Sequence, residues 1–274
     1  MLWPVAGLRR PRNLDAARRV AEVRRAHPES EAWLGLLAAA LDESERGVSW
    51  DAAVPRPAAD RPVRAPLLFG AELSVHRRTA RRWVRRIGAR VDPRALLEAA
   101  VCQDDARIDA LAAETGGEPA ALRVVGQMAA LPLLLACGRA FGADLSPTWW
   151  EGYCPICGAW PVLAESVGLG RKRQLRCGRC GIGWAIPQLR CVFCDETDHE
   201  HLGYLAPEDR DAARTIEICK TCRGYVKGLT TVRPLAPWDI LLDDLTTVHL
   251  DVVALERGYQ RPERPGYALE ARVV

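Results

Sequence analysis

Eight of the ten cysteines in this sequence fall into pairs with metal-ligand spacing. The pairs are Cys154/Cys157, Cys177/Cys180, Cys191/Cys194 and Cys219/Cys222. A Cys-x-x-Cys turn places two thiolates on one side of a tight loop, which is half of a tetrahedral four-sulfur site. Four such pairs in one stretch of chain therefore predict two metal sites of four cysteines each.

The spacing of the pairs predicts which of them share a metal. The segments 158–176 and 195–218 are each long enough to hold a hairpin or a strand and return, whereas 181–190 is shorter. We therefore expect the first pair to join the second, and the third to join the fourth. A cross-braced grouping is the alternative.

Four sulfur ligands suit either zinc or iron, and the spacing does not decide between these two metals. Four protein ligands close the coordination shell and leave no position for water or substrate, which argues against hydrolytic metal catalysis. Structural Zn²⁺ contributes on the order of 10–16 kcal/mol to a small site. We expect two structural metal sites, with a redox-active site as the alternative.

The residue after each second cysteine differs between the two predicted sites. Gly158 and Gly181 can adopt the positive φ that a metal-binding turn favours without strain. In the third pair the corresponding residue is Asp195, which tolerates the same conformation. In the fourth pair it is Arg223, and the glycine comes one residue later, at position 224. The second site is therefore predicted to be less regular.

Other residues of reactive type have simpler explanations. His199 and His201 are surplus to four complete cysteine pairs, which predicts a solvated loop. Cys102 and Cys137 lie in helical patterns among alanine, valine and leucine, and are predicted to be buried small hydrophobes. The sequence has no nucleophile elbow, phosphate loop or dinucleotide fingerprint. We therefore predict that the protein is not an enzyme and has no catalytic residues.

An arginine-rich helix is the second feature that could bind a partner. Between about 71 and 90, Leu73, Ala80, Trp83 and Ile87 form a predicted inward stripe. The outer surface carries Arg77, Arg78, Arg81, Arg82, Arg85 and Arg86. Such a surface is usually solvated, and the alternative is that it binds an acidic partner.

Periodicity predicts the elements that position these residues. Residues 1–148 contain about six helical segments with apolar faces, which predicts a helical N-terminal domain. Two four-cysteine modules of short hairpins follow, at 149–188 and 189–235. The last part, 236–274, is predicted to be a helix and a tail. The inward face of that helix is expected to carry Leu241, Leu245, Val248, Val252 and Leu255. The fold class is therefore α+β.

Composition narrows the function classes. The chain has 274 residues, 49% of them hydrophobic, and a net charge of +3, which is too mild to indicate nucleic acid without a local patch. The N-terminus lacks the pattern of a secretory signal, so we expect a cytoplasmic protein whose paired cysteines bind metal. The apolar run 124–138 is shorter than the ~20 residues of a spanning helix, so no membrane insertion is expected.

The order of these motifs resembles the FdhE family of formate dehydrogenase accessory proteins, best from Tyr153 to Pro262. The matching motifs are Cys-Pro-Ile-Cys-Gly at 154–158, the knuckle at 177–181 followed by Trp184, Arg190-Cys191, Cys219, Cys222, Gly224-Tyr225-Val226-Lys227, Asp243-Asp244-Leu245 and Gly258-Tyr259. Asp195 stands where the family often has glycine, and the N-terminal half matches weakly.

The resemblance implies a helical domain followed by two rubredoxin-like modules, with iron as an alternative to zinc. Family members are cytoplasmic maturation factors that contact the catalytic subunit of formate dehydrogenase during assembly, before export. They are not the dehydrogenase itself, so the expected partner is that subunit, without nucleic acid or membrane insertion.

Two other function classes stay open. A zinc-ribbon nucleic-acid-binding protein is compatible with Arg171-Lys172-Arg173 and the arginine-rich helix, although the mild charge counts against it. A rubredoxin-like redox protein would require iron in the cysteine sites. The sequence leaves the oligomeric state open.

Overall fold

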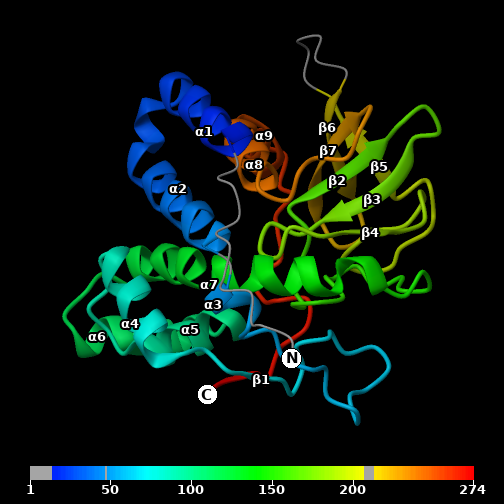
Figure 1. Cartoon of the computed structure of the whole chain (residues 1–274). Coiled ribbons are helices and arrows are strands. Elements are labelled where there is room, and N and C mark those ends of the chain that lie inside the picture. Colours follow the sequence, from blue (N-terminus) through cyan, green and yellow to red (C-terminus); the bar gives the residue numbers. More distant parts are fainter. Residues whose placement is uncertain (1–13, 47, 207–212) are drawn as a thin grey trace. The chain divides into compact units, whose positions relative to one another are not determined.

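The computed structural model describes residues 14–46, 48–206 and 213–274, which form an α+β fold of two compact units (Figure 1). The first unit takes its residues from Met1–Ala59, Leu68–Ala140 and Glu270–Val274, and the second from Asp60–Leu67 and Phe141–Leu269. Each unit thus combines segments that are distant in the sequence. The domain boundaries expected from composition stay a prediction.

The first unit is mainly helical. Its helical elements are α1 (Leu14–Ala26), η1 (Pro28–Ser30), α2 (Glu31–Glu45), α3 (Val48–Asp51), α4 (Arg77–Arg86), α5 (Pro93–Cys102), α6 (Asp105–Glu114) and α7 (Pro119–Phe141). The strands β1 (Glu72–Leu73) and β8 (Arg272–Val273) pair in parallel. Asp92 caps α5 by accepting a hydrogen bond of 2.8 Å from the backbone N–H of Ala95, as its Asp-Pro signature predicts.

The arginine-rich helix is shorter than the sequence predicted. It begins at Arg77, where His76 caps it, and the preceding residues are extended instead. Ala71, Leu73 and Val75 are buried and alternate with exposed residues, which is the period of a strand. Leu73 therefore belongs to β1 and not to the inward stripe of α4, which consists of Thr79, Ala80, Trp83 and Val84.

Helix α7 is longer than the apolar run that predicted it. The segment Pro119–Asp144 is long and apolar enough to cross a membrane by length and composition alone. However, 61% of its most apolar stretch is buried within the fold, including every residue from Met128 to Gly138. This burial is what a core helix shows.

The second unit is built on a six-stranded sheet in the order β4-β3-β2-β7-β6-β5. Its strands are β2 (Leu163–Val167), β3 (Lys172–Arg176), β4 (Gly183–Ala185), β5 (Leu202–Leu205), β6 (Arg214–Cys219) and β7 (Tyr225–Thr231). The central pair, β2 and β7, is parallel, and all the other neighbours are antiparallel. Because β2–β4 belong to the first cysteine module and β5–β7 to the second, this pair joins the two modules into one sheet.

The C-terminal segment forms two short helices, α8 (Ile240–Thr246) and α9 (Val248–Glu256). Leu250 and Ala254 of α9 pack against Ile216, Ile218 and Tyr225 of the sheet. The inward face predicted from the sequence is therefore wrong, because three of its five residues, Val248, Val252 and Leu255, are exposed. The break at Thr247, whose hydroxyl donates to the carbonyl of Asp243 at 2.7 Å, changes the phase between α8 and α9.

A buried ion network attaches these helices to the sheet. Lys227 of β7 is 1% exposed, and its Nζ lies 2.7 Å from carboxylate oxygens of both Asp244 and Asp251. Arg261 contacts the same two carboxylates at 2.9 Å, and the hydroxyl of Tyr225 donates to Asp251 at 2.7 Å. Two cations thus balance two anions, which is the condition for burying charge.

Candidate metal centres

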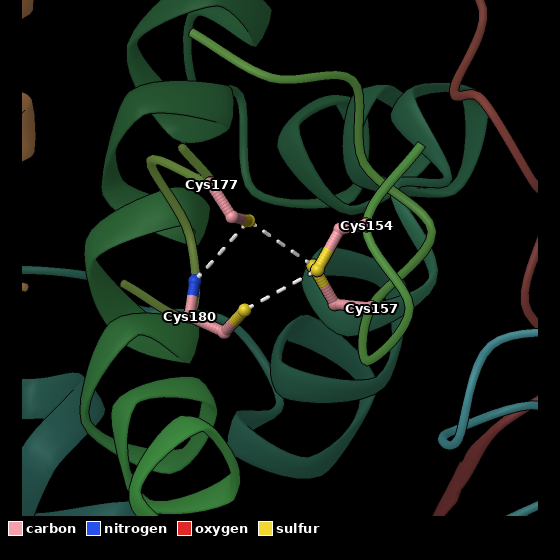
Figure 2. Close-up of side chains that lie close together, drawn as sticks. All are labelled: Cys154, Cys157, Cys177 and Cys180. Carbon is pink, nitrogen blue, oxygen red and sulfur yellow. Dashed lines mark hydrogen bonds between the residues drawn. The ribbon is translucent and has the colours of Figure 1, made fainter. Parts of the chain in front are cut away.

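The first four-cysteine cluster is formed by two turns of the second unit. Cys154 and Cys157 come from the turn that precedes β2, and Cys177 and Cys180 come from the turn between β3 and β4 (Figure 2). The four Sγ atoms lie within 4.8 Å of one another, and all four residues are buried. The sequential grouping expected from the spacing is therefore the one found.

The sulfur separations fit a metal site. Sγ of Cys154 lies 3.4 Å from that of Cys180, and Sγ of Cys157 lies 3.5 Å from that of Cys177. A disulfide requires about 2.05 Å. Four sulfurs at ~2.3 Å from a tetrahedral metal are about 3.8 Å apart, so both separations are close to those of such a site.

The backbone of both turns is arranged to stabilise thiolates. The N–H groups of Ile156 and Arg179 donate to Sγ of Cys154 and Cys177, each at 3.4 Å. Gly158 and Gly181 have φ of 69° and 75°, as the knuckle motif predicts. Such N–H···S contacts offset part of the negative charge of a metal-bound thiolate.

Burial disfavours negative charge in this cluster unless a cation is bound. Removal from water raises the pKa of the Cys154 and Cys180 thiols well above the ordinary value, whereas hydrogen bonds from the neighbouring thiols lower the pKa of Cys157. Four thiolates in a buried pocket need an opposite charge. A zinc or iron ion, if held by these four cysteines, would supply that charge, and the four-sulfur donor set suits both metals.

The second cluster also has four cysteines, in a more open environment. Sγ of Cys191 lies 3.7 Å from that of Cys222, and Sγ of Cys194 lies 3.8 Å from that of Cys219. Cys191 and Cys219 are buried, Cys222 is half-buried and Cys194 is exposed. Burial raises the pKa of the Cys222 thiol to about 11. These separations match the tetrahedral value of ~3.8 Å.

The turns of the second cluster repeat the knuckle conformation without glycine. Asp195 and Arg223 have φ of 63° and 59°, and Asp195 is also bound to Arg190 by an ion pair of 2.8 Å. The expectation that Gly224 takes the left-handed conformation in place of Arg223 is therefore wrong. Arg223 holds it while its guanidinium lies 4.0 Å above the Tyr259 ring and donates to the carbonyl of Arg257 at 2.7 Å.

Gly224 has a different reason to be glycine. A Cβ at this position would lie 2.5 Å from Cδ2 of Phe193 and 3.1 Å from Sγ of Cys222. Phe193 lies between the cysteines of the third pair, so the ring of one turn packs against the backbone of the other. The second cluster is therefore held by close packing as well as by its sulfurs.

The remaining cysteines and histidines lie outside both clusters. His201 is exposed with Nδ1 3.2 Å from Glu196, and His199 is exposed beside Asp198, as expected for a solvated loop. Cys137 is fully buried, as predicted. Cys102 is only half-buried, unlike the prediction, and its Sγ donates to the carbonyl of Ala271 at 3.3 Å next to β8.

Sequence reasoning missed the polar residues that support the clusters. Glu165 of β2 is fully buried and accepts hydrogen bonds from Thr231, Gln174 and the backbone N–H of Leu235 at 2.7 to 3.0 Å. It therefore ties β2 to strands of both modules. The sequence signal for this role is an acidic residue, Glu165, among apolar residues. The same pattern can equally indicate the end of a strand.

The six arginines of α4 are all exposed and divide into two groups. Arg82 and Arg86 form ion pairs with the buried Glu43 of α2 at 3.3 Å, and Arg86 also contacts Asp42 at 2.9 Å. Within the described part of the chain, Arg77, Arg78, Arg81 and Arg85 have no ion-pair partner. Of the six arginines predicted to bind a partner, Arg82 and Arg86 thus form ion pairs between α4 and α2.

Three comparisons relate this chain to known proteins. A family model for the FdhE C-terminal domain matches residues 189–265. That range contains the second cluster, the ion network of Lys227 and both C-terminal helices.

Curated relatives match over a larger part of the chain than the family model does. The FdhE homolog of Aquifex aeolicus is 32% identical over 120 residues, and FdhE of Escherichia coli O127:H6 is 32% identical over 112 residues. The FdhE homolog of Stutzerimonas stutzeri is 34% identical over 123 residues. These alignments cover 42%, 40% and 43% of this chain, and 41%, 35% and 39% of the relatives, respectively.

The fold as a whole is similar to that of a solved protein. The crystal structure of the FdhE protein from Pseudomonas aeruginosa has a TM-score of 0.57 and 22% identity, with 93% of this chain and 94% of that chain covered. The family model and the curated relatives relate the C-terminal part of this chain to the FdhE family, as its motifs had indicated. The crystal structure shows that the fold is shared.

Proposed function

We propose that this protein is a cytoplasmic maturation factor for formate dehydrogenase that binds the catalytic subunit during assembly, before export. The observation that carries the proposal is the match of residues 189–265 to the FdhE C-terminal domain, since this range includes the second cysteine cluster and its supporting network. The similar fold of the Pseudomonas aeruginosa FdhE protein supports it over most of the chain.

A non-enzymatic role is consistent with the chemistry of the clusters. Each cluster offers four cysteine ligands, which close a tetrahedral shell and leave no open position for a substrate. The two turns of each cluster and the shared sheet instead form a rigid module whose surface can contact another protein.

Deletion of the gene in the native host tests this function. The expected result is loss of formate oxidation with the dehydrogenase subunits still synthesised, and recovery when the gene is restored. Co-purification of the catalytic subunit with the tagged protein tests the predicted partner. Full formate oxidation with unchanged cofactor loading in the deletion strain would contradict the proposal.

We also propose that all eight paired cysteines are ligands, and that each cluster holds iron or zinc. Elemental analysis of protein purified anaerobically from the native host is expected to give two metal ions per chain. The four-sulfur set accepts both metals, so the measurement identifies which one is bound. A metal content near zero in folded protein would exclude the ligand assignment.

A rubredoxin-like redox role is the second candidate, and the exposure of Cys194 favours it for the second cluster. Electron transfer to an iron site is easier when one ligand reaches the surface. This candidate requires iron and a reversible colour change on reduction, whereas zinc is colourless and redox-inert. Protein that contains only zinc when isolated anaerobically would remove it.

A further inference from the structure

Helix α4 presents two rows of arginines with different surroundings. Arg78, Arg82 and Arg86 are spaced four residues apart and form one row, and two of its members are paired with Glu43 and Asp42 of α2. Arg77, Arg81 and Arg85 form the second row with the same spacing. Within the described residues, no carboxylate forms an ion pair with this second row.

The second row continues into a hollow beyond the end of the helix. A hollow of about 590 Å³ is lined by Arg81, Arg85, Gly88, Ala89, Arg90, Val91 and Pro93. Three of these lining residues are arginines, and none is acidic. The nearest carboxylate in the sequence, Asp92, caps helix α5 through the backbone N–H of Ala95. Among the described residues, no carboxylate lies within ion-pair distance of Arg81, Arg85 or Arg90, which line the hollow.

We propose that Arg77, Arg81, Arg85 and Arg90 form a binding surface for an acidic peptide segment of another protein. Arginine suits this role because its planar guanidinium binds a carboxylate through two parallel hydrogen bonds. Residues four apart on a helix rise about 6 Å, and alternate side chains of an extended peptide repeat every ~6.6 Å. A segment with glutamate at alternate positions therefore matches the row in both charge and spacing.

A peptide fits this surface better than a nucleic acid. Single-stranded nucleic acids are bound by basic grooves that also offer exposed aromatic rings for base stacking. The residues that line the hollow include no aromatic ring, and Trp83, the aromatic residue of α4, is fully buried. The inference does not rest on the proposed role in formate dehydrogenase maturation.

The test measures binding of a fluorescein-labelled peptide of six Glu-Ser repeats to the full chain by anisotropy, at about 50 mM salt. We expect binding that weakens as salt rises, since the contacts are exposed ion pairs. In the triple variant R77E/R81E/R85E the affinity is expected to fall about tenfold or more. The variant R77K/R81K/R85K keeps the charge but not the paired hydrogen bonds, so it is expected to retain part of the affinity.

A matched triple variant, R25E/R56E/R107E, controls for net charge. These three arginines are exposed, belong to the first unit and have no ion-pair partner within the described residues. The control is expected to bind the peptide with nearly unchanged affinity. Circular dichroism of all variants verifies the helical content.

Three outcomes would overturn the inference. The first is no detectable binding of the Glu-Ser peptide at 50 mM salt, and the second is an equal loss of affinity in the matched control. The third is tighter binding of an oligo(dT) strand of 12 nucleotides than of the peptide, abolished by R77E/R81E/R85E, which would assign the row to nucleic acid.

Discussion

The two clusters each have four cysteines and similar sulfur separations, yet they differ in contact with solvent. All four cysteines of the first cluster are buried, whereas the second cluster exposes Cys194 and half-exposes Cys222. In the first cluster glycine occupies the left-handed turn positions, and in the second Asp195 and Arg223 occupy them. Ligand type therefore determines which metals can bind, and the surroundings determine how easily a metal or its ligands can be reached.

The largest expected effect comes from removing one ligand. In Cys177→Ala the buried first cluster loses a sulfur where water cannot easily replace it. Because a structural metal contributes on the order of 10 kcal/mol, comparable to the whole stability of a domain, the second unit is expected to unfold. In the matched variant Cys194→Ala, water can take the open position, so the unit stays folded and binds its second metal more weakly.

Thermal unfolding and metal content of the two variants check this contrast. The helical first unit should keep its own unfolding transition in both. Equal loss of structure in Cys177→Ala and Cys194→Ala would show that exposure of the ligand does not matter.

The next effect tests the support beneath the second cluster. Lys227 is three residues after Gly224, and Lys227→Met leaves Asp244 and Asp251 with Arg261 as their remaining cation. Breaking a buried ion pair by removing one partner costs about 3–5 kcal/mol. We expect lower denaturant stability and faster metal loss from the second cluster. A variant that loses metal first from the first cluster would refute this link.

Accessibility predicts a kinetic difference in the unmodified protein. Iodoacetamide should label Cys194 before any cysteine of the first cluster, because only an exposed thiolate can be approached. A chelator should likewise remove one metal about tenfold faster than the other. Mass spectrometry of labelled peptides and absorbance of the chelate provide the two readouts. Labelling of Cys154 or Cys180 before Cys194 would contradict the prediction that the second cluster is the more accessible one.

The smallest effect concerns the turn residues. Asp195→Gly relieves a left-handed φ but removes an exposed ion pair with Arg190, so a change of less than ~1 kcal/mol is expected. Gly158→Ala should lower the stability more, because its Cβ would lie 2.6 Å from the carbonyl oxygen of Tyr267. Chemical denaturation of both variants measures the difference. Equal losses would mean that the two knuckles are constrained alike.

Local pattern in the sequence predicted the cysteine pairs, their grouping and the short hairpins of both modules. It failed where distant residues decide the structure. Strand β2 is hard to predict from local pattern because Glu165 interrupts its apolar run. Hydrogen bonds from β3, β7 and the segment after β7 make the burial of Glu165 favourable. The face of α9 was wrong because Thr247 breaks the helix and shifts its phase.

The parallel pairing of β2 with β7 has a consequence for cutting the chain. The matched domain, 189–265, contains β7 but not β2, whose partners run from Leu163↔Lys227 to Val167↔Thr231. An excised fragment would present β7 as a bare edge, with buried residues from Tyr225 to Leu229 opened to solvent. Unpaired apolar edges recruit other chains. We therefore expect the fragment to self-associate, so the homology boundary is not a boundary of autonomous folding.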